Sequence, residues 1–346
     1  MSSDPASSGW STHSLASRFE ESLPGVVALM RAYETAALGR TDTTAAEAEA
    51  ELRAPEVDRD HSAVVLRGDE VIGLRLVFVD PAEREVTLDC WIHPQLPDDD
   101  QRSLLGELAQ GADDVAARLA TAAEPVPPAE AADPWQASPR VWQLVAGAYR
   151  QDRVWSEQLQ SLGLRQVRTF QRMRLEHGLA VPEPTPPAGV AVHDAVDVSD
   201  LRDAWSVHQR AFADHWGGEA QRDFDAWVEY QKAFAGFDPT LWSVAVLDDE
   251  PVGLCAASDS RVEDGISYVP LLGIVREARG RGIARFLLRR EFARSARRGL
   301  PITELTVDSE SLTGADRLYR SVGMAPTVII DSWLRPIRTA GPPESA

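Results

Sequence analysis

Two stretches of the chain repeat one pattern of apolar and polar positions. His61–Pro94 and Leu241–Glu277 each contain an apolar segment, an acidic turn, a second apolar segment with a glycine (Gly73 or Gly253), another charged turn and a third aliphatic segment. Short apolar segments separated by charged turns are typical of neighbouring strands. Each stretch therefore predicts a three-stranded meander, and the chain is expected to contain two copies of one unit.

The second copy predicts an α/β fold with a mixed sheet. Leu201, Trp205 and Phe212 lie on the apolar side of a helix, and strands and helices then alternate in a clear order. The expected elements are helices at about 198–216 and 224–234, strands at about 241–247, 251–258 and 265–275, a helix at about 281–298, a strand at about 302–308, a helix at about 313–321 and a final strand pair at about 327–336.

Proline-rich segments set the predicted domain boundaries. Both copies end in a similar phrase, QLQSLGLRQV around Gly163 and RLYRSVGMAP around Gly323, and the first copy holds an additional Pro/Ala-rich loop at Ala120–Arg140. The predicted domains are residues 15–178 and 190–338, joined by a stiff Pro-rich linker at 179–189. The ends, about 1–14 and 339–346, are expected to be disordered.

Composition narrows the functional classes. The net charge of -19 disfavours nucleic-acid binding, because so acidic a surface repels a polyanion. Neither a membrane span of about 18 apolar residues nor a secretory leader is recognisable, so a cytoplasmic protein is expected. Cys90 and Cys255 are far apart in apolar segments, as buried free thiols are, and the seven His residues show no metal-ligand spacing. No metal is therefore expected.

One segment has the opposite charge to the rest of the chain. Arg276–Arg298 contains nine Arg, two Glu and no Asp. It follows a predicted strand, and Gly280 and Gly282 precede a predicted helix. Unpaired N–H groups and the helix dipole favour an anion at such a helix start, and glycines let a ligand approach the backbone closely. An Arg-rich surface helix that merely starts at a glycine is the alternative interpretation.

Two motifs of the second copy resemble those of the GCN5-related N-acetyltransferase (GNAT) superfamily. Arg279-Gly280-Arg281-Gly282-Ile283-Ala284 matches the acyl-CoA motif Arg/Gln-x-x-Gly-x-Gly/Ala, and VDSESLTGADRLYRSVGM, Val307 to Met324, resembles the later motif of that family. The resemblance implies an N-acyltransferase (EC 2.3.1 class) that uses acetyl-CoA, or another acyl-CoA or phosphopantetheine thioester, as its co-substrate, with the basic segment at the pyrophosphate. The residues it implies for this co-substrate are Leu272, Gly273, Ile274, Val275, Arg279, Gly280, Arg281, Gly282, Ile283, Ala284, Arg285 and Ser311. Ser311 replaces the usual Asn of the family, which puts one contact to the CoA arm in doubt.

The first copy resembles the same fold without its chemistry. Asp98, Asp99 and Asp100 stand where the cradle is expected, and three carboxylates repel a pyrophosphate. We therefore expect two tandem GNAT folds, the N-terminal one degenerate, as in mycothiol synthases and a number of actinobacterial acyltransferases, which this arrangement resembles.

The catalytic assignments differ in how well the sequence supports them. In the family, a backbone N–H of the fourth strand polarises the thioester carbonyl, and a tyrosine acts as general acid. Tyr319 matches this tyrosine, with a role as core filler on an amphipathic helix as the alternative. The general base stays open between His215, Asp214, a water chain without a dedicated base, and the fourth-strand position of Tyr268 and its neighbour Ser267.

Three functions remain. The first is acyl transfer from a CoA thioester to the amine of a small molecule, by direct attack in a ternary complex. The second takes the acyl group from the phosphopantetheine of an acidic carrier protein, which would dock on the only evident basic surface, the Arg276–Arg298 face. The third is a non-catalytic acyl-CoA-binding scaffold.

Overall fold

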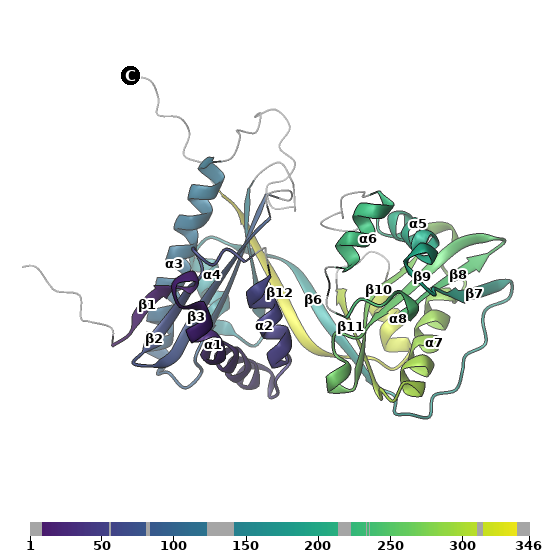
Figure 1. The fold of residues 1–346 in the computed structure, drawn as a ribbon, viewed down its shortest axis with the longest axis horizontal. Helices are drawn as coiled ribbons and strands as arrows, with labels where there is room; N and C mark the ends of the chain where they lie inside the picture. The colour runs from purple at the N-terminus through teal and green to yellow at the C-terminus, as the bar shows by residue number, and fades with distance from the viewer. Residues whose placement is uncertain are drawn as a thin grey trace, which may run out of the picture. The chain divides into compact units, whose positions relative to one another are not determined.

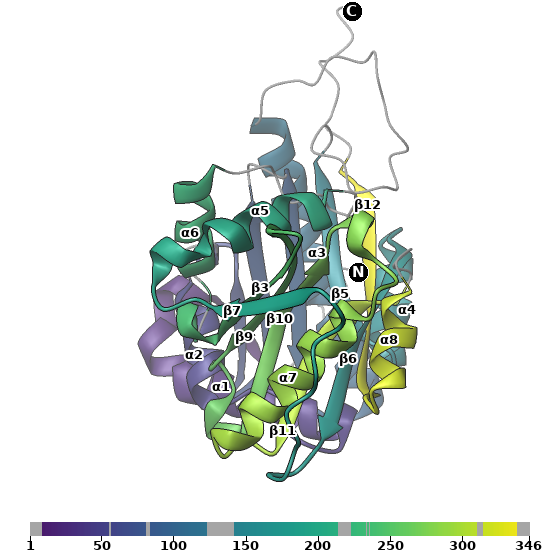
Figure 2. The same ribbon diagram turned by 90° about the vertical axis from the view of Figure 1, so that its right-hand side faces the viewer.

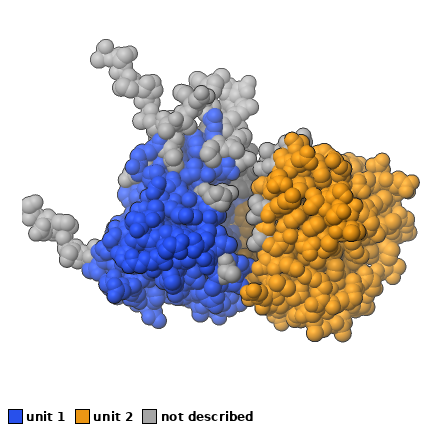
Figure 3. Space-filling model, viewed as in Figure 1, with its two compact units in different colours: residues 1–168, 330–346 blue, residues 169–329 orange. Residues whose placement is uncertain are grey.

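The chain divides into two compact units. The computed structural model describes residues 9–54, 57–80, 84–122, 142–213, 223–232, 234, 236–309 and 314–337 of the 346. Unit 1 contains residues 1–168 and 330–346, and unit 2 contains residues 169–329 (Figure 3). These units do not coincide with the predicted domains 15–178 and 190–338, because the C-terminal segment of the chain returns to unit 1.

Two long strands explain this division. β6 (Arg165–Glu176) leaves unit 1, and its second half pairs antiparallel with β11 (Ile302–Asp308) of unit 2. β12 (Ala325–Pro336) leads from unit 2 back to unit 1. Its residues 330–336 pair antiparallel with β5 (Gln143–Tyr149) of unit 1. The prediction of a final strand pair at 327–336 is therefore wrong. The segment is one uninterrupted strand, which finds its partner far away in the sequence.

Unit 1 is a sheet covered by helices on both faces (Figure 1). The order of its strands is β1-β2-β3-β4-β5-β12. Side chains of β3 alternate between two cores: Ile72 and Val77 pack with α3 and α4, whereas Leu74 and Leu76 pack with α1 and α2. Its elements are β1 (Ser11–Ser14), α1 (Leu15–Leu38), α2 (Ala45–Arg53), β2 (Ala63–Arg67), β3 (Glu70–Asp80), β4 (Glu85–Ile92), α3 (Asp98–Ala122), β5 and α4 (Arg153–Ser161). Ser11–Ser14 was expected to be disordered, but it pairs with β2.

Unit 2 repeats this layering with strand order β6-β11-β10-β9-β8-β7. A Cβ at Gly273 on β10 would contact Ala211 at the end of α5. Gly253 pairs with Ile274, the next residue of β10, and a Cβ at Gly253 would contact Ile283 of α7. Successive strand residues face opposite ways, so α5 and α7 cover opposite faces (Figure 2). The remaining elements are β7 (Val190–Asp194), α5 (Leu201–Ala211), α6 (Phe224–Lys232), β8 (Trp242–Leu247), β9 (Glu250–Ser258), β10 (Ile266–Ile274), α7 (Ile283–Arg297) and α8 (Ala315–Ser321).

The registers confirm the internal repeat in detail. Gly73 pairs with Val65 and Gly253 with Ala245, and in both meanders the register shifts immediately after this pair. A local irregularity at the same place in both copies is conformational detail that the apolar pattern alone does not contain. The predicted equivalence of Gly73 and Gly253 is therefore confirmed. The predicted linker, residues 179–189, contains neither helix nor strand.

Both cysteines lie in the cores, as predicted. Cys90 and Cys255 are free and buried, on β4 and β9. Burial raises the pKa of the Cys255 thiol to about 12, so this group is a neutral, unreactive core residue at neutral pH.

Candidate active site

The sheet of unit 2 opens between β10 and β11. The parallel pairing of these strands covers only Ile266–Tyr268 opposite Ile302–Glu304. Between Tyr268 and Leu271 the register of β10 against β9 shifts by one residue, whereas β11 stays paired with β6 as far as Asp308. A bulge bends its strand and ends regular pairing. The two strands separate beyond these pairs, and backbone polar groups of β10 beyond the bulge are available to a ligand.

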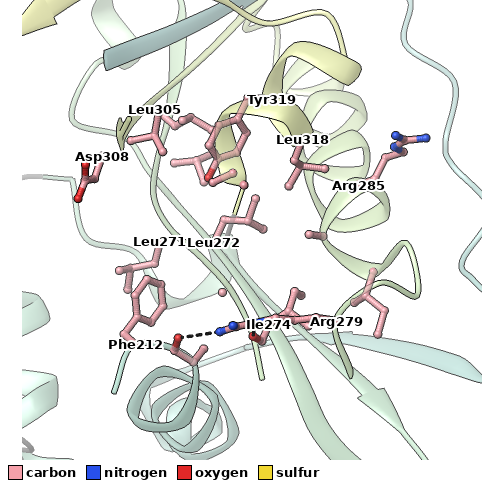
Figure 4. Close-up of a pocket in the computed structure, with 18 of the residues that line it drawn as sticks. Phe212, Leu271, Leu272, Ile274, Arg279, Arg285, Leu305, Asp308, Leu318 and Tyr319 are labelled. Carbon is pink, nitrogen blue, oxygen red and sulfur yellow. Dashed lines mark hydrogen bonds between the residues drawn. The ribbon is translucent and has the colours of Figure 1, made fainter. Parts of the chain in front are cut away.

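A pocket of about 800 Å³ fills this opening (Figure 4). This volume is in the usual range for a site that takes a small molecule or cofactor. The lining is predominantly apolar, with a few polar groups. It is formed by Phe170, Ala211, Phe212, Val269, Pro270, Leu271, Leu272, Gly273, Ile274, Ala278, Arg279, Gly280, Gly282, Ile283, Ala284, Arg285, Leu305, Thr306, Val307, Asp308, Gly314, Ala315, Leu318 and Tyr319.

The glycine loop at one end of the pocket can hold an anion. Gly280 and Gly282 have φ of 78° and 80°, which other residues adopt only with strain. A Cβ on either would find no atom within 4 Å, so conformation, and not crowding by the protein, requires glycine here. Gly282 is the N-cap of α7 and has no side chain to satisfy the first helical N–H groups. These N–H groups and the helix dipole fit a pyrophosphate.

The exposed Arg279 braces this loop. Its Nε donates a hydrogen bond to the carbonyl of Ile274 (3.1 Å), and its Nη2 donates to the carbonyl of Ala211 (3.3 Å). Figure 4 shows its side chain along the floor of the pocket. Arg279 therefore ties the loop to the end of β10 and to the C-terminus of α5, in addition to bringing charge to the site.

The other expected co-substrate residues are placed unequally. Two of them do not line the pocket: Val275 is buried and Arg281 is exposed. The pocket is lined by Leu272, Gly273, Ile274, Ile283, Ala284 and Arg285. Gly273 permits close approach of α5, because a Cβ there would lie 2.6 Å from Cε2 of Phe212. Phe212 thus forms a wall of the pocket, although the sequence indicated only that it lies on the apolar side of a helix.

Tyr319 projects into the pocket from α8 (Figure 4). It is 6% exposed, and burial raises the pKa of its hydroxyl well above the ordinary value. The hydroxyl therefore stays protonated at neutral pH. Among the described residues, no hydrogen bond to this hydroxyl is found, so its proton is available to a bound ligand.

Of the residues considered as general base, the structure describes Tyr268 and its neighbour Ser267. Asp214, His215 and Ser311 lie outside the described residues. The hydroxyl of Tyr268 donates to Oγ1 of Thr306 (3.1 Å), and Tyr268 does not line the pocket. Ser267 is fully buried and donates to Oε1 of Glu291 (2.8 Å), which leaves it a structural role.

One carboxylate does line the pocket. Asp308, at the end of β11, is the only acidic side chain among the described lining residues. It is 7% exposed and lies at the end of the pocket away from the glycine loop (Figure 4). The sequence contained it within the motif around Val307, but gave no reason to single it out.

The arginines at the C-terminal end of the basic segment form ion pairs within unit 2. Arg290 pairs with Asp194 (2.7 Å), Arg294 with Glu291 and Asp194, Arg297 with Glu183, and Arg298 with Asp259 (2.6 Å). These pairs connect α7 to β7 and to the predicted linker. Four of the nine arginines of the segment are thus paired, and the C-terminal part of the helix is less basic than its sequence indicates.

Comparison with known proteins agrees with this geometry. Residues 201–324 match the family model of the acetyltransferase (GNAT) family. This match lies within unit 2. Its splayed strands, glycine loop and Tyr319 all lie within the matched segment, as the resemblance of the two motifs predicted.

Structural similarity covers both units of the chain. A GCN5-related N-acetyltransferase from Sphaerobacter thermophilus is similar over 97% of this chain and 98% of its own, with a TM-score of 0.79 and 22% identity. A tandem GNAT protein from the clavulanic acid biosynthesis pathway is similar over 96% and 99%, with a TM-score of 0.68 and 15% identity. At these identities the likeness establishes the fold: two GNAT folds in tandem.

Curated relatives match over a shorter length. Mycothiol acetyltransferase of Streptomyces avermitilis is 32% identical over 169 residues, which are 48% of this chain and 53% of that protein. Mycothiol acetyltransferase of Streptomyces coelicolor is 30% identical over 191 residues, 52% of this chain and 60% of that protein. The chain thus spans little more than half the length of these relatives.

Two further properties bear on the classes considered from composition. Within the described ranges, no helix is long and apolar enough to cross a membrane. Among the described residues, no group of three or more His, Cys, Asp or Glu side chains is arranged to hold a metal ion.

Proposed function

We propose that this protein is an N-acyltransferase that moves an acetyl or other acyl group from a CoA thioester to the amine of a small molecule. The observation that carries the proposal is the pocket of unit 2. The glycine loop, β10 beyond its bulge and Tyr319 all line this one cavity of about 800 Å³, which supports the proposal.

The donor would lie along the opening of the sheet. The pyrophosphate of CoA binds the N–H groups of Gly280–Ala284 at the start of α7, where the helix dipole favours its charge. The pantetheine arm extends between β10 and β11 and hydrogen bonds to the backbone of β10, in the place that a neighbouring strand would otherwise take. This arrangement brings the thioester to the interior end of the pocket, near Leu272 and Tyr319.

Direct attack then completes the transfer. The neutral amine attacks the thioester carbonyl carbon, a C–N bond forms, and negative charge develops on the carbonyl oxygen. A backbone N–H of β10 beyond the bulge stabilises this charge. As the C–S bond breaks, Tyr319 donates its proton to the leaving thiolate and is restored by the proton that the amine nitrogen releases. Water relays this proton.

The acceptor amine would enter at the end that carries Asp308. This carboxylate attracts an ammonium group, and the surrounding Phe170, Phe212 and Leu271 side chains accept an apolar or aliphatic body. An acceptor related to mycothiol is the first to test, because curated relatives carry the name mycothiol acetyltransferase.

Mass spectrometry tests the proposal. The purified protein is incubated with acetyl-CoA and a panel of small amines, and both the acetylated product and free CoA are measured. We expect release of CoA that depends on one amine class and matches acetyl product mole for mole. Binding of acetyl-CoA without turnover of any amine would favour the scaffold alternative. Turnover only from an acyl carrier protein would replace the CoA donor.

A further inference from the structure

Three arginines beside the glycine loop differ from the other arginines of the basic segment. Arg281, Arg285 and Arg289 are all exposed. Among the residues that the structure describes, none of the three forms an ion pair with a carboxylate. In contrast, Arg290, Arg294, Arg297 and Arg298 all do.

Their spacing brings the positive charges together. Arg285 and Arg289 are four residues apart on α7, so they are neighbours on one face, about 6 Å apart along the helix axis. Arg281 comes just before the helix, next to Gly282. Like charges at this spacing destabilise a helix slightly. In a protein with 54 acidic and 35 basic residues, carboxylates are abundant, so uncompensated arginines at this place require an explanation.

The position of Arg285 connects these charges with the pocket. Arg285 lines the mouth, its guanidinium is directed away from the β10 wall (Figure 4), and its Nη2 donates to Oγ of Ser321 (3.0 Å). This neutral partner leaves the charge uncompensated and holds the side chain toward α8. A ligand group that stays outside the pocket, next to the glycine loop, would therefore meet these arginines first.

Unit 1 shows that the fold itself does not need these charges. His93 N–H donates to the carbonyl of Ile72 and Val275 N–H to that of Val252, so the two strand ends correspond. Leu96 and Ala278 then make the same turn, to His93 and Val275. Counted onward from these residues, the positions of Arg281, Arg285 and Arg289 correspond to Asp99, Ser103 and Glu107.

We infer that Arg281, Arg285 and Arg289 form a second phosphate site, which binds the ribose 3′-phosphate of coenzyme A; the inference rests on the proposed function. The 3′-phosphate and the 5′-pyrophosphate of CoA are attached to the same ribose. A pyrophosphate on the glycine loop therefore places the 3′-phosphate close by, at the mouth of the pocket. Arginine suits this group, because its planar guanidinium can bind phosphate with two hydrogen bonds.

The chemical consequence is selection of the donor. The phosphopantetheine arm of a carrier protein has no adenosine and no 3′-phosphate, so it would leave the three arginines unpaired. Free CoA and its thioesters fill the site. The glycine loop recognises only the phosphate that both donors share. The second phosphate site thus distinguishes a CoA thioester from the phosphopantetheine thioester of a carrier protein.

Calorimetric titration with CoA and with 3′-dephospho-CoA tests this without knowledge of the acceptor. We expect wild-type protein to bind CoA about tenfold more tightly than dephospho-CoA, the effect of a charge-assisted contact at an exposed site. In the double variant Arg285→Gln/Arg289→Gln, CoA affinity should fall to that of dephospho-CoA, whose own affinity stays within about twofold. Arg297→Gln is the matched control: it removes one charge from the same helix, at a residue that is paired with Glu183, and should preserve the preference.

The outcomes separate the inference from the function beneath it. Equal affinity of wild-type protein for the two compounds would overturn the second phosphate site and leave the proposed function intact. The same conclusion follows if the double variant loses affinity for both compounds equally. Binding of neither compound to wild-type protein would overturn the proposed function itself.

Discussion

The two units share one fold but use the same region for different purposes. In unit 2, β10 carries a bulge, a glycine loop follows it, and a pocket of about 800 Å³ opens. In unit 1, β4 pairs with β3 in regular register along its whole length, from Ile92 opposite Gly73 to Glu85 opposite Asp80. The pocket at the corresponding place has only about 220 Å³. The parallel pairing ends early in both units, after Thr87 of β4 and after Tyr268 of β10, so the units differ in the bulge and in the size of the pocket.

The glycine loop has a helical counterpart in unit 1. Gly280–Gly282 precedes α7, which begins at Ile283, whereas the corresponding residues Asp98–Asp100 already form the first turn of α3. Helical residues direct their N–H groups along the helix axis, and carboxylates in the first turn interact favourably with the dipole. The sequence indicated that these carboxylates repel a phosphate. The structure adds that the backbone cradle itself is missing.

The tyrosines differ as well. Leu164 N–H donates to the carbonyl of Leu159, and Met324 N–H donates to that of Tyr319, so both helices end in the same turn. By this correspondence, Leu159 stands in the place of Tyr319 and is fully buried. The tyrosine that does line the small pocket, Tyr33, donates its proton to Asp152 within unit 1. Unit 2 therefore differs from unit 1 in the bulge of β10, in the glycine loop and in a pocket tyrosine whose hydroxyl is not engaged by another described side chain.

The largest effect is expected from the glycine loop. Gly282→Glu introduces a side chain at φ of 80°, at a strain of about 1–2 kcal/mol, and puts a carboxylate where the phosphate binds. Calorimetry with CoA should show one site per chain in wild-type protein and a loss of at least about a hundredfold in the variant. Gly106→Glu on α3, where a Cβ has free space, is the control and should bind normally. Two equivalent sites in wild-type protein would refute the contrast between the units.

The next effect concerns the two tyrosines. Tyr319→Phe removes the proton donor but keeps the ring, so kcat and kcat/KM should fall together by about 10², with donor affinity nearly unchanged. Tyr33→Phe, which removes the hydroxyl that bonds to Asp152, should lower the melting temperature without a comparable kinetic loss. A fall in kcat of less than threefold for Tyr319→Phe, with chemistry limiting, would assign Tyr319 to the core and leave water as the acid.

Local patterns in the sequence predicted much of this site. The two meanders, the glycine loop, the following helix and Tyr319 are all encoded within a few neighbouring residues, and the structure places the loop and Tyr319 on one pocket. β11 has the predicted bounds, Ile302–Asp308. Such features depend on periodicity and on backbone conformations that only glycine adopts easily, which a single sequence shows directly.

The features that the sequence did not predict depend on distant partners. β12 pairs with β5 across more than half of the chain, and Arg297 pairs with Glu183 of the linker. The nine arginines of Arg276–Arg298 therefore predicted a basic surface. The local sequence does not show which of them form ion pairs with distant carboxylates after folding. The bulge of β10 was equally invisible, since its residues, Val269 and Pro270, continue the apolar pattern of a strand.

A smaller effect, on stability, is expected in unit 1. Unit 1 has an acidic residue, Asp89, where unit 2 has the pocket residue Leu271. Asp89 lies three residues before Ile92, which pairs with Gly73, and Leu271 lies three residues before Ile274, which pairs with Gly253. Burial and the charges of Asp89, Glu34 and Glu47 raise the pKa of Glu51 to about 7. The pKa of this carboxyl in the folded protein lies above its value of 4.5 in the unfolded chain. The free energy of unfolding therefore falls as the pH rises from about 4.5 to about 7.

Glu51→Gln should therefore stabilise the protein at pH 8 and not at pH 4.5. The gain is at most about 3 kcal/mol, or a rise of a few degrees in the melting temperature of unit 1. Thermal unfolding at the two pH values measures it, with the exposed Glu49→Gln on the same helix as control. An equal shift at both pH values would show that packing, and not ionisation, is responsible.

The smallest effect distinguishes charge from backbone as the reason why unit 1 lacks the site. The triple variant Asp98→Asn/Asp99→Asn/Asp100→Asn removes the repulsion but leaves a helix-forming sequence. It loses favourable interactions with the dipole of α3, about 1 kcal/mol or less per residue at an exposed helix start. The residues of unit 1 that correspond to the Gly280–Gly282 loop are helical. Removal of their charge should therefore create no second site, and CoA should still bind with one equivalent per chain. Calorimetry at high CoA concentration, with urea unfolding to monitor stability, measures both effects. A second equivalent of bound CoA would show that three carboxylates alone disable unit 1, and that its helix start unwinds for a phosphate once they are neutral.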